Sequence, residues 1–413
     1  MIRIAALVTL AVVVVTVSAV AETTLPLVWH VESADGDELD SHDADVPINP
    51  ASVVKLATTL WALEQLGPDH RFETRFAIRG TLDEATGVLD GDLLVEGTAD
   101  PDFHVENAYL IARALNAAGL RTVRGRLLVD DRFWLGWEGG SESKTGAGSR
   151  EVAMATRLRD ALDPARWDRR TRRLVREFRA RAGIEGETPA IVVEGAAGVR
   201  SGQLDGRILV VHRSNPLRRV LKRFNSYSNN DIERLGESLG TPAELAGRLR
   251  GRWGATPRTL NLETLSGLGS NRMTSRHVIR LLRELDATCR RLGLRIEDLL
   301  ASNGCDPGTL KHFPRLSSGA AATLVAKTGT LIRTDGGVAV LAGVVRTAEG
   351  RRFFCVAAPR SGKRLVGARE AEERWVLELI QRHGGARPGE CGDGVGYSDD
   401  DVVVIREPAG SCR

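Results

Sequence analysis

A serine and a lysine stand three residues apart at the start of a strongly apolar stretch, in the sequence NPASVVKL at 49–56. Apolar residues recur at helical spacing as far as Leu66, and the following Gly-Pro pair ends the pattern, which predicts a helix. Residues three apart lie on one face of a helix. We therefore expect Ser52 and Lys55 to be neighbours in the first turn of that helix.

This pairing suggests a nucleophile with its own base. A serine hydroxyl attacks poorly unless an adjacent base takes its proton, and a lysine is such a base only when its amine is neutral. Its reference pKa of about 10.4 must fall to roughly 7–8, through burial and a second nearby cation. The hypothesis therefore requires another lysine close in space. A plain helix start is the alternative, because a second Ser-x-x-Lys, at Ser141 and Lys144, lies in a Gly/Ser-rich loop.

Two later segments could complete such a site. Lysine occurs only six times in the chain, and one copy, Lys327, ends a strand-like run as Lys327-Thr328-Gly329-Thr330. Gly329 would let a substrate backbone approach closely, and the two threonine hydroxyls and the amine suit a carboxylate. The second segment is Ser228-Asn229-Asn230, where the hydroxyl of Ser228 could relay a proton and the amide of Asn230 could orient lysine and substrate.

The order of these three motifs resembles the active-site set of penicillin-binding proteins and serine β-lactamases. Longer stretches narrow the resemblance: GDLLVEGTADPDF, VRGRLLVDDRFW, NSYSNNDIERL, SGLGSNRMT, GCDPGTLKHF and VAKTGTL. They look like the D-alanyl-D-alanine carboxypeptidase/endopeptidase family of penicillin-binding protein 4, the class C low-molecular-mass group. The resemblance covers roughly residues 45 to 360. The 176 positions between Ser52 and Ser228 fit this family, which places extra domains there.

The resemblance implies an α+β fold, with a β-lactamase/transpeptidase-like antiparallel sheet flanked by helices and a smaller strand-rich domain inserted between the first and second motifs. It implies hydrolysis of the D-Ala-D-Ala bond, with or without endopeptidase activity, through an acyl-serine intermediate that penicillins also form. Neither metal nor organic cofactor is needed. The roles it implies are nucleophile (Ser52), base (Lys55), proton relay (Ser228) and substrate binding (Asn230, Lys327, Thr328, Gly329, Thr330). The backbone N–H groups of Ser52 and Thr330 would form the oxyanion hole.

The expected domain boundaries follow from these motifs and from composition. Residues 1–21 read as a signal peptide, with a positive start, an apolar run and a small-residue cleavage pattern at Ala21. A discontinuous catalytic domain takes residues 22–88 and 205–385, and the insertion takes residues 89–204. A Gly- and Asp-rich tail occupies residues 386–413. We expect export to a bacterial periplasm, where peptidoglycan stem peptides and β-lactams would be the partners.

Cysteine usage and charge add weaker constraints. Pairing of Cys391 with Cys412 would anchor the tail, and Cys289 with Cys305 is another option, but sequence cannot fix connectivity. No His-Glu-x-x-His motif is present, which disfavours that type of zinc hydrolase. The net charge of +3 is too small to indicate nucleic-acid binding.

An arginine-rich run at 166–182 allows two interpretations. One is a solvated helix face, and the other is peripheral association with an anionic cell wall or membrane surface. Two further activities stay open at this point: a β-lactamase or D-amino-acid esterase on the same fold, and a non-catalytic wall-binding protein.

Overall fold

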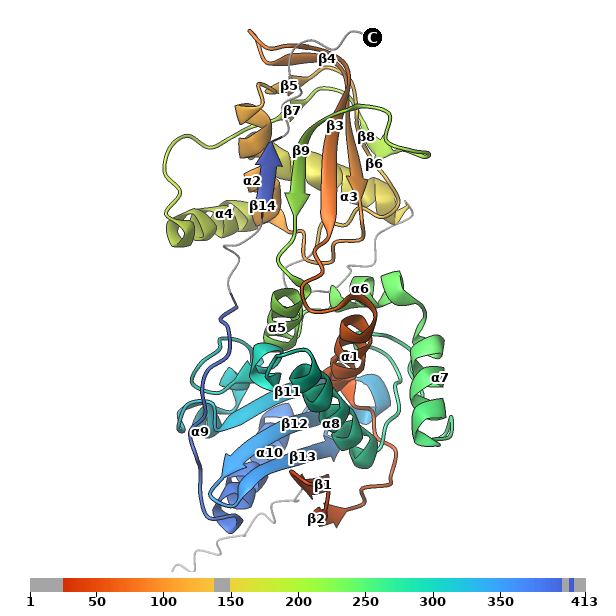
Figure 1. Cartoon of the computed structure of the whole chain (residues 1–413), viewed down its shortest axis with the longest axis vertical. Helices are drawn as coiled ribbons and strands as arrows, with labels where there is room; N and C mark the ends of the chain where they lie inside the picture. Colours follow the sequence, from red (N-terminus) through yellow and green to blue (C-terminus); the bar gives the residue numbers. More distant parts are fainter. Residues whose placement is uncertain (1–24, 137–148, 396–400, 405–413) are drawn as a thin grey trace, which may run out of the picture.

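The computed structural model describes residues 25–136, 149–395 and 401–404, the last four through their backbone. Figure 1 shows two lobes joined by a narrower waist. The chain leaves the lower lobe after α1 (Lys55–Leu66), builds the upper lobe, and returns through α5 (Leu217–Tyr227). The upper lobe is therefore an insertion in the lower one. The expected signal peptide at 1–21 lies outside the described residues.

An antiparallel sheet of six described strands forms the centre of the lower lobe, in the order β10-β11-β12-β13-β1-β2. The strands are β1 (Val28–Ser33), β2 (Glu38–His42), β10 (Ala301–Ser302), β11 (Leu324–Leu331), β12 (Val338–Thr347) and β13 (Gly350–Pro359). Within the described chain, β10 pairs only with Val325 and Ala326 of β11. The rest of β11, which carries Lys327 to Thr330, is thus an edge where an extended substrate could approach.

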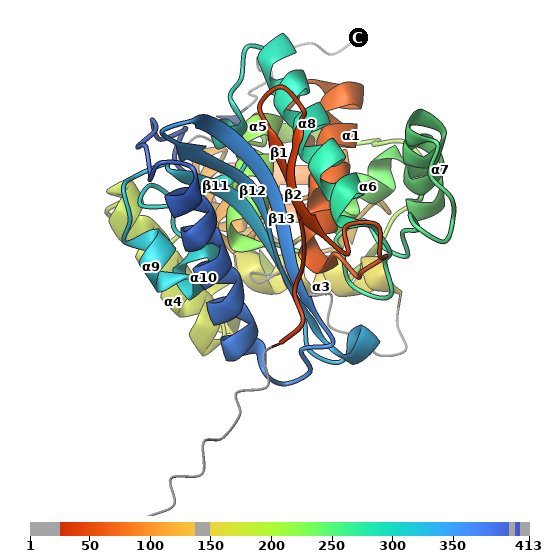
Figure 2. The same ribbon diagram turned by 90° about the horizontal axis from the view of Figure 1, so that it is seen from below.

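Helices cover both faces of this sheet, as Figure 2 shows for α8 and α10. In β12, Val340 and Val344 join the core under α1 and α8, while Leu341 and Val345 join the core under α10. This alternation is the two-residue period of a strand buried on both sides. The helices of the lower lobe, besides α1 and α5, are α6 (Ile232–Leu239), α7 (Pro242–Trp253), α8 (Ser275–Arg291), α9 (Pro314–Ser317) and α10 (Leu365–Arg382). The predicted antiparallel sheet flanked by helices is confirmed.

The upper lobe is built on a second, mixed sheet, in the order β14-β9-β3-β4-β5-β7, with β6 and β8 beside β4. Its strands are β3 (Glu73–Asp83), β4 (Val88–Gly97), β5 (Thr122–Val123), β6 (Leu127–Val129), β7 (Val192–Val193), β8 (Ala197–Val199), β9 (Arg207–Arg213) and β14 (Asp401–Val404). Helices α2 (Val105–Ala117) and α3 (Arg150–Leu162) share its core, and α4 (Arg169–Ala182) packs on α2.

The strand pairings set wider limits for the insertion than the 89–204 that the sequence predicted. Thr74 of β3 lies opposite both Gly97 of β4 and His212 of β9, so β3 and β9 are neighbours in the upper sheet. The insertion therefore extends from about residue 73 to residue 213. Nothing in the local pattern of a short strand tells which sheet it joins, because that depends on long-range pairing.

The C-terminal tail also departs from expectation. Cys391 forms a disulfide with Cys305, across 86 residues, and not with Cys412, which lies outside the described residues. Cys289 and Cys355 are buried free thiols, so the proposed Cys289–Cys305 pair is wrong as well. Beyond the disulfide, β14 pairs antiparallel with β9. Residues 401–404 of the tail thus belong to the sheet of the upper lobe.

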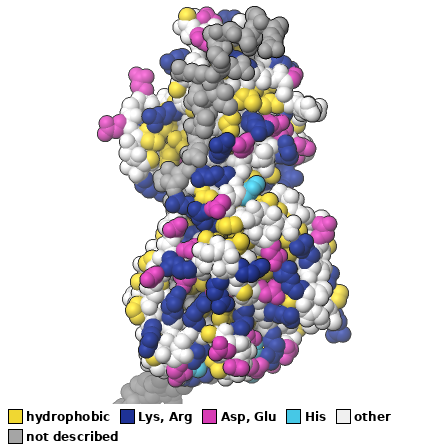
Figure 3. All heavy atoms as spheres, viewed as in Figure 1, with side chains coloured by type: hydrophobic (Ala, Val, Ile, Leu, Met, Phe, Trp, Pro, Cys, Tyr) yellow, Lys and Arg dark blue, Asp and Glu magenta, His cyan; other side chains and the backbone are white. Residues whose placement is uncertain are grey.

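Basic and acidic side chains are interspersed over the face shown in Figure 3. This mixture matches the small net charge of the sequence. Among the described residues no helix combines the length and the apolar character that a membrane span requires.

Candidate active site

The nucleophile candidate sits where a short 3₁₀ turn (Ala51–Val54) leads into α1. Ala51 adopts a φ of 48°, a conformation that alanine rarely takes, and its N–H donates to Asn49 Oδ1 at 3.0 Å. This turn holds Ser52 half-buried, with Oγ 3.1 Å from Lys55 Nζ. Ser52 and Lys55 are therefore neighbours, as the sequence predicted.

Lys55 is fully buried among acceptors that fix the direction of its amine. Besides Ser52, Nζ contacts Asn230 Oδ1 at 2.8 Å and the carbonyl oxygen of Ser266 at 2.6 Å. Burial lowers the pKa of Lys55 to about 7, against an opposing attraction from the carboxylate of Glu233. A large fraction of the amine is therefore neutral near neutral pH, as a base requires.

The second motif lies at a break between two helices. Helix α5 ends at Tyr227, and Ser228 takes the left-handed conformation, with a φ of 56°. The break turns Ser228 Oγ to within 3.0 Å of Lys327 Nζ, while Asn230 faces Lys55. A continuous helix would place residues 228 and 230 on different faces, so the break brings them into one site.

Lys327 is fully buried, and its contact with Ser228 joins the third motif to the second. Its Nζ also donates to the backbone oxygen of Thr328 at 2.8 Å. Burial first, and repulsion from Lys55 second, hold the pKa of Lys327 well below its usual range. The sequence predicts that burial and a second lysine together lower the pKa of Lys55. The second lysine is present, but burial is what lowers the pKa of Lys55, and Lys327 bears the repulsion.

Close packing places β11 directly beside the nucleophile. A Cβ atom on Gly329 would lie 2.7 Å from the oxygen of Pro50 and 3.3 Å from the nitrogen of Ser52. Only glycine leaves this space, so Gly329 allows β11 to pack against the turn that carries Ser52. The predicted oxyanion donors, the N–H groups of Ser52 and Thr330, therefore lie on adjacent segments.

Sequence reasoning missed the loop that covers the base. Gly267, with a φ of 90°, approaches the turn so closely that a Cβ atom would lie 2.0 Å from the oxygen of Ala51. Glu233 supports this loop by accepting the N–H groups of Leu265 and Ser266 at 2.9 and 2.7 Å. A backbone carbonyl that accepts from Lys55 cannot be recognised from residue types, because every residue has one. Only the family resemblance of residues 266–274 pointed to this loop.

A buried ionic cluster joins the insertion to the second motif. Arg223 of α5 pairs with Asp102 of the upper lobe at 2.8 Å, and His104 Nε2 lies 3.6 Å from Asp102 and 3.7 Å from Asp231. Burial, with Arg223 and Arg157 nearby, holds the pKa of His104 well below its usual range, so the ring is neutral. Because Asp231 directly follows Asn230, the insertion supports the segment that carries Ser228.

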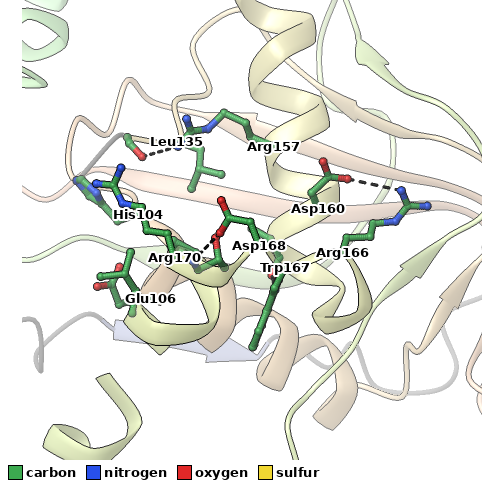
Figure 4. Close-up of a pocket in the computed structure, with 14 residues that line it drawn as sticks. His104, Glu106, Leu135, Arg157, Asp160, Arg166, Trp167, Asp168 and Arg170 are labelled. Carbon is green, nitrogen blue, oxygen red and sulfur yellow. Dashed lines mark hydrogen bonds and ion pairs between the residues drawn. The ribbon is translucent and has the colours of Figure 1, made fainter. Parts of the chain in front are cut away.

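A separate cavity of about 270 Å³ lies in the insertion, between α2, α3 and α4 (Figure 4). It contains none of the predicted site residues. Arg166 and Arg170, both from the arginine-rich run, line it together with Arg157, beside the carboxylates of Asp160 and Asp168. Part of the run therefore faces this cavity, and the charges that line it are mixed.

The geometry defines a serine hydrolase of the acyl-enzyme type: a hydroxyl, a buried amine of lowered pKa, a second hydroxyl–amine pair and an open strand edge. The family model for the D-Ala-D-Ala carboxypeptidase 3 (S13) family matches residues 27–144 and 177–374. The chain therefore belongs to this family. The unmatched residues 145–176 contain α3 and the start of α4, so the family pattern does not cover that part of the insertion.

Individual relatives agree with this assignment. A D-alanyl-D-alanine carboxypeptidase from Actinomadura sp. is 39% identical over 104 residues, which is 25% of this chain and 19% of the relative. The match thus spans about a fifth of that protein's length.

Two solved structures cover nearly the whole chain. The penicillin G-acylated predatory endopeptidase Bd3459 of Bdellovibrio bacteriovorus, solved with the immunity protein Bd3460, is 25% identical with a TM-score of 0.71, covering 89% of this chain and 95% of that one. Penicillin-binding protein 4 of Haemophilus influenzae is 18% identical with a TM-score of 0.60, covering 86% and 97%. The second likeness supports the fold alone.

Proposed function

We propose that the protein cleaves the bond between the two terminal D-alanines of peptidoglycan stem peptides, through an ester on Ser52. The observation that carries the proposal is the 3.1 Å contact between Ser52 Oγ and the buried amine of Lys55, whose pKa is about 7. Membership of the S13 family and the penicillin-acylated neighbour support the same chemistry.

The first half-reaction forms the acyl-enzyme. Ser52 Oγ attacks the carbonyl carbon of the penultimate D-alanine as its proton passes to Lys55 Nζ. The N–H groups of Ser52 and Thr330 stabilise the oxyanion. As the C–N bond breaks, Ser228 delivers its proton to the departing D-alanine amine and takes up the proton that Lys55 received, so Lys55 is neutral again for the second half-reaction. Lys327, 3.0 Å from the oxygen of Ser228, holds that hydroxyl in place.

The second half-reaction is hydrolysis of the ester. Water attacks the acyl carbon, Lys55 Nζ accepts its proton, and the Ser52–acyl bond breaks, which restores the hydroxyl and releases the shortened peptide. Asn230 binds the substrate amide and orients Lys55 through the 2.8 Å contact. Thr328 and Thr330 bind the terminal carboxylate from the open edge of β11, with Lys327 beside them.

Intact-mass spectrometry after exposure to benzylpenicillin tests the proposal. The wild-type protein gains one covalent penicilloyl group and Ser52→Ala gains none. D-alanine release from a D-Ala-D-Ala peptide then separates a peptidase from a β-lactamase or esterase, for which a cephalosporin would be hydrolysed faster than the peptide. An unlabelled wild-type protein would support a non-catalytic wall-binding protein instead.

Endopeptidase activity on D-alanyl cross-links is a second candidate. The likeness to the predatory endopeptidase Bd3459, which covers 89% of this chain, favours this activity. Release of monomers from purified cross-linked dimers measures it directly, with Ser52→Ala as the control.

We also propose that the protein acts outside the cytoplasm, in the periplasm, after removal of residues 1–21. N-terminal sequencing of the protein from a periplasmic fraction tests this, and Glu22 is the expected first residue. For peripheral association through the 166–182 run, pull-down on sacculi is the test. Wild-type binding should fall when the exposed arginines of α4 are changed to glutamine, and unchanged binding rejects it.

A further inference from the structure

One side of β11 carries a row of polar groups that ends in an arginine from a distant helix. Thr328 Oγ1 donates to Thr309 Oγ1 at 2.7 Å, and two residues along the same strand face, Thr330 Oγ1 accepts from Arg369 Nη2 at 3.1 Å. Arg369 belongs to α10, which packs on the side of the sheet opposite α1. Because the guanidinium donates to Thr330, that hydroxyl keeps its own hydrogen to donate.

Among the described residues Arg369 forms no ion pair, although the buried carboxyl group of Glu372 interacts with it electrostatically. Glu373, one turn further along α10, accepts the N–H groups of Arg315 and Leu316 at 2.8 and 3.1 Å. Glu372 is fully buried, and burial raises its pKa well above the usual range against the opposing attraction of Arg369.

Lys327, by contrast, is poorly placed to supply charge to a ligand. It is fully buried, its amine already contacts Ser228 Oγ and the oxygen of Thr328, and burial beside Lys55 holds its pKa well below the usual range. Arg369 keeps its charge at any working pH. It is half-buried and lines a hollow of about 560 Å³, together with His312, Arg374 and the carboxylates of Glu370 and Glu373. Its 3.1 Å contact with Thr330 places the guanidinium at the edge of β11, where a ligand on that edge can reach it.

We propose that Arg369 binds the free C-terminal carboxylate of the substrate together with Thr330 and Thr328, and so makes the enzyme prefer peptides that end in an acid. This inference rests on the proposed function and names the residue that determines its specificity. An arginine suits the role, since its planar fork can donate two parallel N–H groups to one carboxylate.

The experiment compares two tripeptides that differ only at the C-terminus, one ending in D-Ala-D-Ala and one in D-Ala-D-alaninamide. Wild type, Arg369→Gln and Arg369→Lys are assayed for release of D-alanine or D-alaninamide. Arg374→Gln is the matched control, because Arg374 lies on the same helix and the same hollow but is exposed. Melting temperatures establish that each variant is folded.

We expect Arg369→Gln to lower the kcat/KM ratio of acid to amide by about 10- to 100-fold, which is the scale of one charged hydrogen-bonding pair. Arg369→Lys should retain part of the preference, and Arg374→Gln should match wild type. An equal fall for acid and amide would assign Arg369 a structural role and overturn the proposal, as would an unchanged ratio.

A second measurement separates this inference from the proposed function. The second-order rate of acylation by benzylpenicillin, relative to its methyl ester, should fall in Arg369→Gln by a similar factor. A wild type that forms no adduct and releases no D-alanine refutes the proposed function, and the inference with it. A wild type that forms the adduct, with the same acid-to-ester ratio in the variant, refutes the inference alone.

Discussion

The pKa of Lys55 should be adjustable through one carboxylate. In Glu233→Gln the negative charge that favours protonated Lys55 is removed, while the side chain can still accept a hydrogen bond from the loop. The pKa of Lys55 should therefore fall below its wild-type value of about 7. Since the neutral amine is the active form, the rate of acylation should reach half of its plateau at a lower pH in the variant.

The size of the shift follows from the contacts through Ser266. Glu233 Oε2 lies 2.7 Å from the nitrogen of Ser266, and Lys55 Nζ lies 2.6 Å from its oxygen. These two contacts and the width of one residue keep the opposite charges within about 9 Å. With an effective dielectric constant of about 20, the attraction is about 1.8 kcal/mol, or a little over one pKa unit.

The assay is the second-order rate of penicillin adduct formation, measured by intact mass between about pH 5 and pH 10, a range that spans the lowered and the ordinary pKa of lysine. Glu263→Gln is the control, because Glu263 is an exposed carboxylate that also accepts an N–H group of this loop, from Ser270. Its profile should overlay that of the wild type. Identical profiles for wild type and Glu233→Gln would refute the Coulombic argument, and a wild-type midpoint near pH 10 would refute the lowering of the pKa by burial.

Three further predictions concern the site and its support. Gly329→Ala should slow acylation by at least about 10-fold, because the added methyl group pushes β11 away from Ser52. The measurement is the rate of penicillin adduct formation. The control is Gly251→Ala, whose added methyl group would meet no other atom. Ser228→Ala should lower kcat for D-alanine release by about 100-fold with a smaller change in KM, as loss of a proton relay predicts; a change in KM alone would contradict that role. Joint replacement of Cys305 and Cys391 by alanine should lower the free energy of unfolding by up to about 4–5 kcal/mol, the chain-entropy limit for an 86-residue loop. Urea unfolding measures this loss. An unchanged urea midpoint would contradict a disulfide in the wild type.

The candidate site was accessible from sequence because its motifs are short and local. Helical periodicity places Ser52 and Lys55 on one face, and a strand ending in Lys327 to Thr330 follows from alternation and a glycine. The break in the helix at Ser228 could not be predicted from sequence, because tertiary contacts override helix propensity there. Asn229 and Asp231 hold the chain in a break, with Asp231 facing His104 of the other lobe.

The sequence by itself determined the helix that carries Lys55, the strand that carries Lys327 and the order of the motifs, since each depends on residues near one another in the chain. The insertion followed from the family resemblance of those motifs. Tertiary structure alone decided which sheet β3 and β9 join, the Cys305–Cys391 pair and the approach of Arg369 to Thr330. It also decided that burial lowers the pKa of Lys55. The reason is physical: strand pairing, disulfide bonding and desolvation depend on groups that meet only after distant segments have packed together.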